Sequence, residues 1–271
     1  MKKKIFVILV ILATVIATGV LFWKESLKPT KNITQGSSPV ESKKEISEDA
    51  SFFKPTIPLP TATPASEKVT VLPEIVWGNR SKKQVILTFD AGADNNSLIK
   101  ILETLKKYNL RTTFFLTGKW VEKNPDLTKR IASEGHEIYN HTYSHPHLTQ
   151  TSDIEIVDEF KRTDRLITNL TGKSTRPYFR PPYGERNSHV LEVAAKEGYQ
   201  SVYWTVDALD WKESEGITSE EVKSRIYTNL KPGTIYLLHI GDNITGNILD
   251  EVIAHLISEG YSIVSLSEGV K

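Results

Sequence analysis

The stretch Gln84-Val85-Ile86-Leu87-Thr88-Phe89 is a run of β-forming residues, and a carboxylate, Asp90, follows it directly. From residue 98 to residue 105, leucine and isoleucine recur at helical spacing, so the run is predicted to be a strand that leads into an amphipathic helix. The same order of strand and helix continues to the end of the chain. This alternation predicts a parallel sheet with helical crossovers, either an open doubly wound sheet or a closed or distorted barrel.

Six further β runs and the helices between them carry this order along the chain. The β runs span residues 112–116, 137–140, 178–180, 201–206, 234–238 and 261–264. Helices are expected over residues 124–135, 154–172, 187–197, 218–230 and 247–259, where candidate caps flank apolar residues at helical spacing. No unit of about 20 to 50 residues repeats, so the sequence excludes a solenoid.

Reactive side chains stand where most of these runs end. They are Asp90, His141, Arg180, Asp207 and His239. Because the carboxyl ends of parallel strands meet at one face of a sheet or barrel, these side chains are expected to form a single site. For Asp207, a strand-end cap without a role in the site is the alternative.

Histidines are concentrated in Asn140-His141-Thr142-Tyr143-Ser144-His145-Pro146-His147, which holds three of the seven in the chain. His141 and His145 are four residues apart, so on a helical turn or in a tight loop their rings can converge on one divalent metal. A solvated surface loop is the alternative, but the position at a strand end favours the metal site. His147 is a spare candidate that we expect to lie outside the ligand set.

The N-terminus has the pattern of a membrane anchor. Met1-Lys2-Lys3-Lys4 precedes nineteen residues without a charge, Ile5 to Trp23. A helix of that length rises about 1.5 Å per residue and can cross a bilayer core about 30 Å thick. No small-residue cleavage site follows, so residues 1–24 are predicted to be an uncleaved signal-anchor with its lysines in the cytoplasm. Cleavage and secretion are the alternative.

Composition divides the rest of the chain into two parts. Residues 25–68 are rich in Ser, Thr, Pro, Lys and Glu and are predicted to be a disordered linker. Residues 69–271 are predicted to be one globular domain held outside the cell at its membrane. Lys plus Arg (34) nearly balance Asp plus Glu (33), which argues against nucleic acid as a partner. The absence of cysteine excludes a disulfide framework and thiolate chemistry.

Five motifs at the strand ends resemble the polysaccharide deacetylase family, the NodB-homology domain of carbohydrate esterase family 4. They are Thr88-Phe89-Asp90-Ala91-Gly92, His141-Thr142-Tyr143-Ser144-His145, Arg180-Pro181-Pro182-Tyr183-Gly184, Asp207-Ala208-Leu209-Asp210-Trp211 and Leu237-Leu238-His239. The resemblance covers residues 84–270. It implies a distorted (β/α) barrel of about seven parallel strands and one divalent metal, with zinc expected and cobalt or nickel as alternatives.

The resemblance also implies which residues activate the attacking water. Asp90 would be the general base that deprotonates the attacking water, and Arg180 would pair with Asp90 and keep it ionised. His141 and His145 would be metal ligands. A structural ion pair is the alternative for Arg180.

The remaining roles concern the acetyl group and the leaving amine. Tyr183 would lend its backbone N–H to the oxyanion, and Trp211 and Leu237 would form the walls of the acetyl pocket. His239, tuned by Asp210, would protonate the leaving nitrogen, which is a poor leaving group until it is protonated. Simple core packing is the alternative for Trp211.

One position departs from the family pattern. The family usually has a second carboxylate, a metal ligand, immediately after the catalytic one, and Ala91 stands there in this chain. Either Asp94 reaches the metal instead, or two histidines bind it weakly. Asp94 is favoured as the ligand, with an N-cap of the following helix as its alternative role.

These observations predict a metal-dependent deacetylase of an N-acetylated cell-wall polysaccharide, with N-acetylglucosamine of peptidoglycan as the preferred substrate. A chitin-oligosaccharide deacetylase and a xylan O-acetyl esterase are the enzymatic alternatives. A non-catalytic cell-wall-binding relative that has lost its metal through Ala91 is the alternative of another class. The chain is expected to be a monomer.

Overall fold

The computed structural model describes residues 70–92 and 94–271 of the chain. The predicted signal-anchor and most of the predicted linker lie outside the described residues, so the structure does not test them. Within the described part of the chain, no helix is both long enough and apolar enough to span a bilayer.

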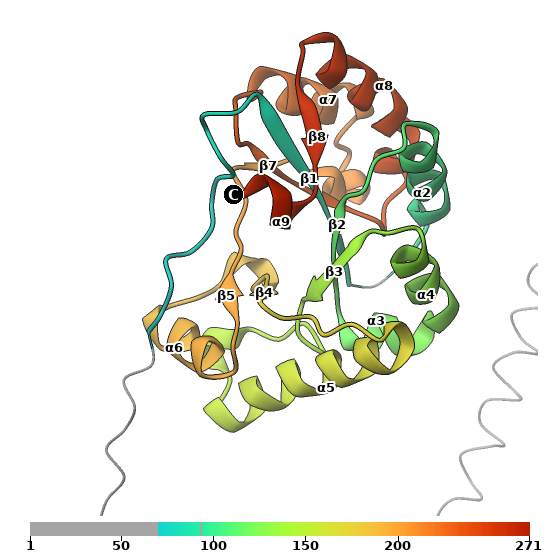
Figure 1. Cartoon of the computed structure of the whole chain (residues 1–271). Helices are drawn as coiled ribbons and strands as arrows, with labels where there is room; N and C mark the ends of the chain where they lie inside the picture. Colours follow the sequence, from blue (N-terminus) through green and yellow to red (C-terminus); the bar gives the residue numbers. More distant parts are fainter. Residues whose placement is uncertain (1–69, 93) are drawn as a thin grey trace, which may run out of the picture. The chain divides into compact units, whose positions relative to one another are not determined.

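All the strands pair in parallel and form one curled sheet (Figure 1). They are β1 (Gln84–Ala91), β2 (Thr113–Leu116), β3 (Glu137–Asn140), β4 (Tyr178–Phe179), β5 (Gln200–Ser201), β6 (Val206–Asp207), β7 (Ile235–His239) and β8 (Ser262–Val264). The order across the sheet is β5-β4-β3-β2-β1-β7-β6, and β8 pairs with the first half of β1. The predicted α/β fold with about seven parallel strands is confirmed. The sheet curls into a half-barrel.

One predicted strand is wrong in its extent. The run at 201–206 was expected to be continuous, but it forms the two short strands β5 and β6 with four residues between them. The strand is interrupted because part of the backbone between β5 and β6 forms hydrogen bonds outside the sheet. The N–H of Tyr203 donates to the carbonyl of Ile75, near the N-terminus of the domain (2.8 Å).

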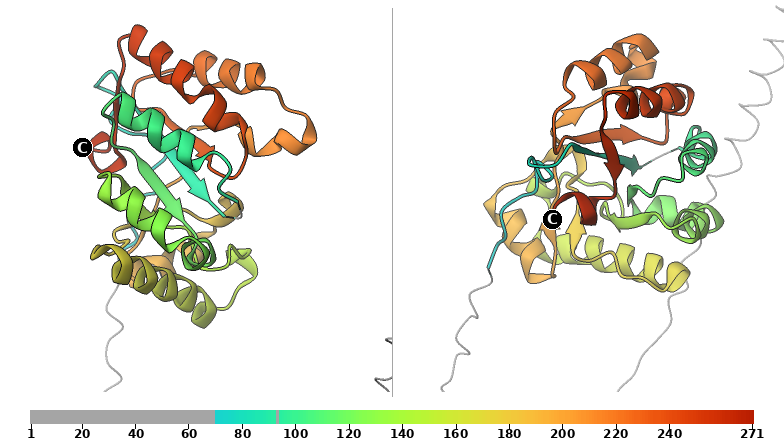
Figure 2. Two further views of the ribbon diagram at one scale, coloured as in Figure 1. Left: turned by 90° about the vertical axis from the view of Figure 1, so that its right-hand side faces the viewer. Right: turned by 45° about the horizontal axis from the view of Figure 1, so that its top comes forward.

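Helices cover the outer side of the sheet, except for the short α9, which packs against Ile86 on the inner side of β1 (Figures 1 and 2). They are α2 (Leu98–Lys107), α3 (Gly118–Lys123), α4 (Pro125–Ser133), α5 (Asp153–Thr171), α6 (Ser188–Lys196), α7 (Ser219–Thr228), α8 (Ile244–Ser258) and the short α9 (Leu266–Gly269). Three 3-10 turns, Leu148–Gln150, Pro182–Gly184 and Asp210–Glu215, interrupt the loops. Six of these helices match the expected ranges within a few residues, and α8 begins three residues earlier than its apolar pattern indicates. The short helices α3 and α9 were not predicted.

The two faces of β1 show how the sheet directs side chains. Val85, Leu87 and Phe89 are fully buried in the main apolar cluster, which includes residues of helices α2 and α8. Because successive side chains of a strand point to opposite faces, Thr88 and Asp90 point to the inner side of the curl. Burial of each large apolar side chain contributes about 1.5–3 kcal/mol, so a shift of β1 by one residue is strongly disfavoured.

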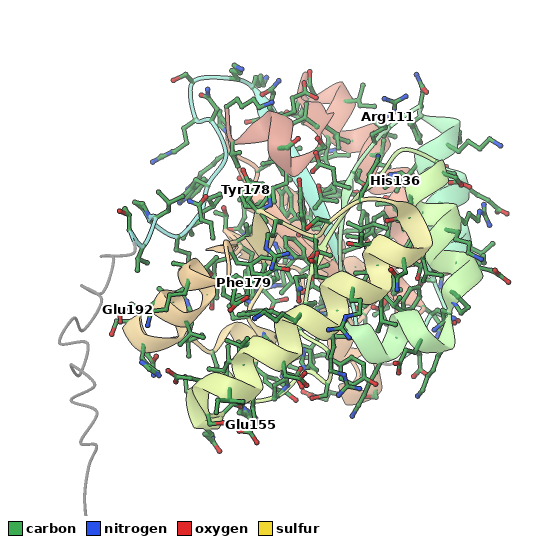
Figure 3. All side chains as sticks on the ribbon, turned by 60° about the horizontal axis from the view of Figure 1, so that its bottom comes forward. Arg111, His136, Glu155, Tyr178, Phe179 and Glu192 are labelled. Atoms are coloured by element: carbon green, nitrogen blue, oxygen red, sulfur yellow. The ribbon has the colours of Figure 1, made fainter. Side chains whose placement is uncertain are left out.

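Strand β4 uses the same alternation. Phe179 packs edge-on against Phe160 of α5, with ring centroids 5.0 Å apart, in the apolar cluster between α5 and α6 (Figure 3). The next residue, Arg180, is therefore directed inward, where its side chain is fully buried.

Candidate active site

A cavity of about 670 Å³ opens at the carboxyl ends of the strands. Of the residues that the sequence places in the site, those lining it are Asp90, Asp94, His141, His145, Tyr183, Asp207, Trp211, Leu237 and His239. Arg180 and Asp210 lie behind this lining and are fully buried. The structure thus brings together every residue that the sequence analysis assigns to one site.

The Asp90–Arg180 pair forms the floor of the cavity. Nη1 of Arg180 donates to Oδ1 of Asp90 (2.7 Å) and to Oγ1 of Thr88 (2.8 Å). Nη2 donates to the backbone carbonyl of Tyr203 (3.1 Å). Burial lowers the pKa of Arg180, and the adjacent Asp90 carboxylate opposes that shift. These contacts leave Oδ2 of Asp90 to face the histidines.

His141 presents a free lone pair to the cavity. Its Nδ1 lies 2.9 Å from the backbone carbonyl of Arg180, which is an acceptor, so Nδ1 carries the proton. Nε2 lies 3.5 Å from Oδ2 of Asp90. Burial holds the pKa of His141 below its usual value, so both facing atoms carry lone pairs at neutral pH. The Nε2 lone pair of His141 is therefore available to bind a cation.

His145 lies beside His141, with ring centroids 4.9 Å apart. Burial lowers the pKa of His145 to about 4, and His141 contributes to that shift, so the ring is neutral. Neutral imidazoles are the form that binds divalent metals. The two rings therefore fit a metal in chemistry and in position.

A tight loop, not a helical turn, brings the two rings together. Thr142 and His145 both adopt left-handed backbone conformations, with φ of 65° and 60°. Glu159 of α5 holds the loop by accepting from the N–H of Tyr143 and of Ser144, each at 2.7 Å, and from the Ser144 hydroxyl. Such positive φ values cost free energy in non-glycine residues, and these contacts offset that cost.

The third ligand is not in place. Asp94 lines the cavity, but it is an exposed residue, and its backbone carbonyl accepts from the indole of Trp120 (3.3 Å). Across residues 70–92 and 94–271, no group of three or more His, Cys, Asp or Glu side chains is arranged to hold a metal ion. The donor set in this conformation therefore consists of the two histidines.

His239 and Asp210 form the opposite side of the cavity. Nδ1 of His239 donates to Oδ1 of Asp210 (2.9 Å), and the backbone N–H of His239 donates to Oδ2 (2.6 Å). Thr245 of α8 also donates to Oδ2 (2.5 Å). Burial disfavours protonation of His239, but the Asp210 carboxylate outweighs it and raises the pKa of His239 to about 9. His239 is thus a cation at neutral pH whose Nε2 carries a proton.

Tyr183 connects the histidine loop to the rim of the cavity. It lies in the 3-10 turn Pro182–Gly184 with a left-handed φ of 56°, an uncommon conformation for an aromatic residue. Its ring packs edge-on against His145 and stacks on His147, with centroids 4.4 Å apart in both cases. His147 also pairs with Glu185 (2.8 Å), so it supports Tyr183 from outside the cavity.

The side walls combine predicted and unpredicted residues. Leu237 is buried, whereas Trp211 is half exposed, with its indole N–H 3.4 Å from Oδ2 of Asp207. The sequence analysis missed Trp204 and Asp242, which also line the cavity. Trp204 was hidden inside the run taken as one strand. Asp242 follows the end of β7 by three residues, so its place just after a strand end was the signal that could have identified it.

Comparison with known proteins gives a consistent result. A family model described as polysaccharide deacetylase matches residues 78–202. The peptidoglycan-N-acetylmuramic acid deacetylase PdaA of Bacillus subtilis is 37% identical over 195 residues, which cover 70% of this chain and 73% of that protein. A peptidoglycan-N-acetylglucosamine deacetylase of Bacillus cereus is 38% identical over 193 residues, covering 70% and 69%. A solved carbohydrate esterase family 4 pseudoenzyme from Bacillus anthracis matches with a TM-score of 0.69 and 33% identity, covering 73% of this chain and 69% of that one.

Proposed function

Because the chain belongs to the polysaccharide deacetylase family, whose enzymes hydrolyse the amide bonds of acetylated polysaccharides, we propose that it deacetylates N-acetylglucosamine of peptidoglycan. Both relatives described above are named as peptidoglycan deacetylases. The proposed place of action is the outer side of the cell membrane, with residues 1–24 as the anchor and residues 25–68 as a spacer that reaches into the wall.

One observation carries the proposal. A carboxylate with an ion-pair partner, Asp90, and a protonated imidazole, His239, line the same cavity from neighbouring strands. The two residues are register partners across β1 and β7. Hydrolysis of an amide requires both a base, which activates the water, and an acid, which protonates the leaving nitrogen.

The chain's own residues account for the proton transfers. A water attacks the acetyl carbonyl carbon and gives its proton to Oδ2 of Asp90, which Arg180 keeps oriented. In this proposal the Tyr183 backbone N–H stabilises the oxyanion that forms. Nε2 of His239 then gives its proton to the amide nitrogen, the C–N bond breaks, and acetate and a free amine are released.

A divalent metal, zinc by preference and cobalt or nickel as alternatives, would be held by His141 and His145, with Asp94 as the proposed third ligand. When bound, such a metal polarises the acetyl carbonyl and makes water a nucleophile near neutral pH. Asp94 must move inward to bind it, and the small residues Ala91 and Gly92 before it make that movement sterically easy. If Asp94 does not move, the two histidines bind metal weakly.

The similarity to a pseudoenzyme makes a non-catalytic wall-binding protein the alternative function. Two features favour catalysis over it. The Asp90–Arg180 pair is almost completely buried, and Asp210 is fully buried behind His239. Burying these charges costs free energy that sugar binding alone does not require. Chitin oligosaccharides and acetylated xylan are the alternative substrates.

The test is chemical analysis of the product. Purified peptidoglycan is incubated with the full-length chain and zinc, digested with a muramidase, and analysed by mass spectrometry. A loss of 42 Da, the mass of one acetyl group less a hydrogen, on N-acetylglucosamine supports the proposal. The same loss on N-acetylmuramic acid corrects the substrate but not the reaction, and deacetylation of chitin or xylan oligomers alone rejects peptidoglycan.

A further inference from the structure

The N-terminal residues of the domain lie across the open side of the half-barrel. We call residues 73–78, which lie along residues 200–205, the seam segment. The N–H of Ile75 donates to the carbonyl of Ser201 (2.9 Å), and Tyr203 donates back to the carbonyl of Ile75 (2.8 Å). Thr205 and Gln200 bond the carbonyls of Val76 and Pro73 with their side chains, each at 2.7 Å. The segment thus pairs in parallel, like a strand, with the chain at Ser201–Tyr203.

Glu74 is the charged residue of this segment, and its carboxylate has three partners. Nε and Nη2 of Arg186 donate to its two oxygens at 2.9 and 2.6 Å, and the Ser201 hydroxyl donates at 2.7 Å. This is a bidentate pair, the geometry in which an arginine and a carboxylate fix each other's orientation. Glu74 therefore holds the Arg186 guanidinium in one position.

Arg186 in turn touches two parts of the cavity wall. Its Nη1 donates to the backbone carbonyl of Gly184 (3.0 Å), the residue after Tyr183. Its guanidinium lies 3.8 Å from the centroid of the Tyr203 ring, and Tyr203 stacks on Trp204, which lines the cavity.

Gly184 closes this arrangement. It has a left-handed φ of 68°, and a Cβ placed there would come within 2.8 Å of the rings of both Tyr203 and Trp204. The turn that carries Tyr183 is thus pressed against the aromatic pair that Arg186 supports. A displacement of Arg186 moves both the turn and the wall.

We propose that Glu74 is a positioning residue for the deacetylation: through Arg186 it fixes the turn Pro182–Gly184, which carries the oxyanion-binding N–H of Tyr183, and the Trp204 wall. The effect on catalysis rests on the proposed function, whereas the ordering of the turn by Glu74 does not. Glu74 lies outside residues 78–202, the span of the family match.

The test uses the full-length chain with Glu74→Gln, which keeps the shape of the side chain and removes its charge. The matched control is Asp164→Asn, because Asp164 pairs with Arg176 at 2.5 Å with similar burial and lies outside the cavity lining. We expect Glu74→Gln to lower kcat/KM about tenfold through kcat, because an oxyanion contact acts in the transition state. Asp164→Asn is expected to stay within twofold of wild type.

Amide hydrogen exchange of residues 183–186 provides a readout that is independent of activity. Glu74→Gln is expected to accelerate exchange there about tenfold, whereas Asp164→Asn leaves it unchanged. The double variant Glu74→Gln/Arg186→Gln is expected to lose no more activity than Arg186→Gln alone, since the two residues act as one unit.

The inference is overturned if Glu74→Gln leaves kcat/KM within twofold of wild type and exchange at residues 183–186 unchanged, even if its melting temperature falls. A wild-type chain that releases no acetate refutes the proposed function instead. In that case the exchange measurement still decides whether Glu74 orders the turn.

Discussion

Replacement of Asp210 by asparagine tests the acid side of the site. Asp210 accepts from Nδ1 of His239 at 2.9 Å and raises the pKa of that imidazole from about 6.5 to about 9. Without the charge, the pKa of His239 is expected to return to about 6.5, because burial lowers it and only the smaller effects of the Asp90 and Asp207 carboxylates still raise it. At pH 8, the protonated fraction of His239 falls from about 0.9 to about 0.03. At pH 6 it falls only from about 1 to about 0.8.

Asp210→Asn is therefore expected to reduce kcat/KM about 20-fold more at pH 8 than at pH 6. The loss at pH 6 measures any effect of the substitution that does not depend on pH. The assays are acetate release from peptidoglycan fragments between pH 6 and 9 and an NMR titration of the His239 ring nitrogens. In wild type, activity should decline only as the pH rises through about 9. An equal loss at pH 6 and pH 8, or a wild-type His239 that titrates near 6.5, contradicts the reasoning.

Three further substitutions test the remaining parts of the site. Asp94→Ala is expected to weaken zinc binding at least tenfold in a calorimetric titration, and an unchanged affinity rejects Asp94 as a ligand. Arg180→Met leaves Asp90 buried without its partner and is expected to destabilise the fold by about 3–5 kcal/mol in urea denaturation, most of which Asp90→Asn restores in the double variant. If the double variant is no more stable than Arg180→Met alone, the unpaired Asp90 carboxylate is not the cause of the lost stability. Glu159→Ala removes the acceptor of two loop amides and is expected to cost about 2 kcal/mol and accelerate hydrogen exchange at Tyr143 and Ser144, and unchanged exchange there contradicts its role.

The fold was predictable where local pattern and tertiary structure agree. The run Gln84–Phe89 alternates between two buried faces, and the helix after it has an apolar stripe, so both elements follow from residues close in sequence. The placement of Asp90, His141 and His239 at one edge followed from the parallel order of the strands alone.

The seam segment was not predictable in this way. Ile75 bonds Ser201 and Tyr203 across more than 120 residues, and nothing in the local sequence around Ile75 signals a strand-like partner. The same contact divides the run at 201–206 and places Trp204 at the cavity. Tertiary hydrogen bonding thus overrode the β propensity of that run.

The candidate site shows a similar division. The pairing of Arg180 with Asp90 and of Asp210 with His239 was expected from the family resemblance, and the structure has both pairs within 3 Å. Their roles in catalysis, and that of Tyr183, stay predictions. The position of Asp94 depends on the conformation of the loop after β1, which no residue pattern determines.

The most direct test of the account is acetate release from purified peptidoglycan by the full-length chain in the presence of zinc, compared with Asp90→Asn. We predict that wild type releases acetate and free amine in equal amounts and that Asp90→Asn binds peptidoglycan equally well but releases neither above the uncatalysed rate. A wild-type chain that sediments with peptidoglycan and releases no acetate would contradict the enzyme and identify a wall-binding protein.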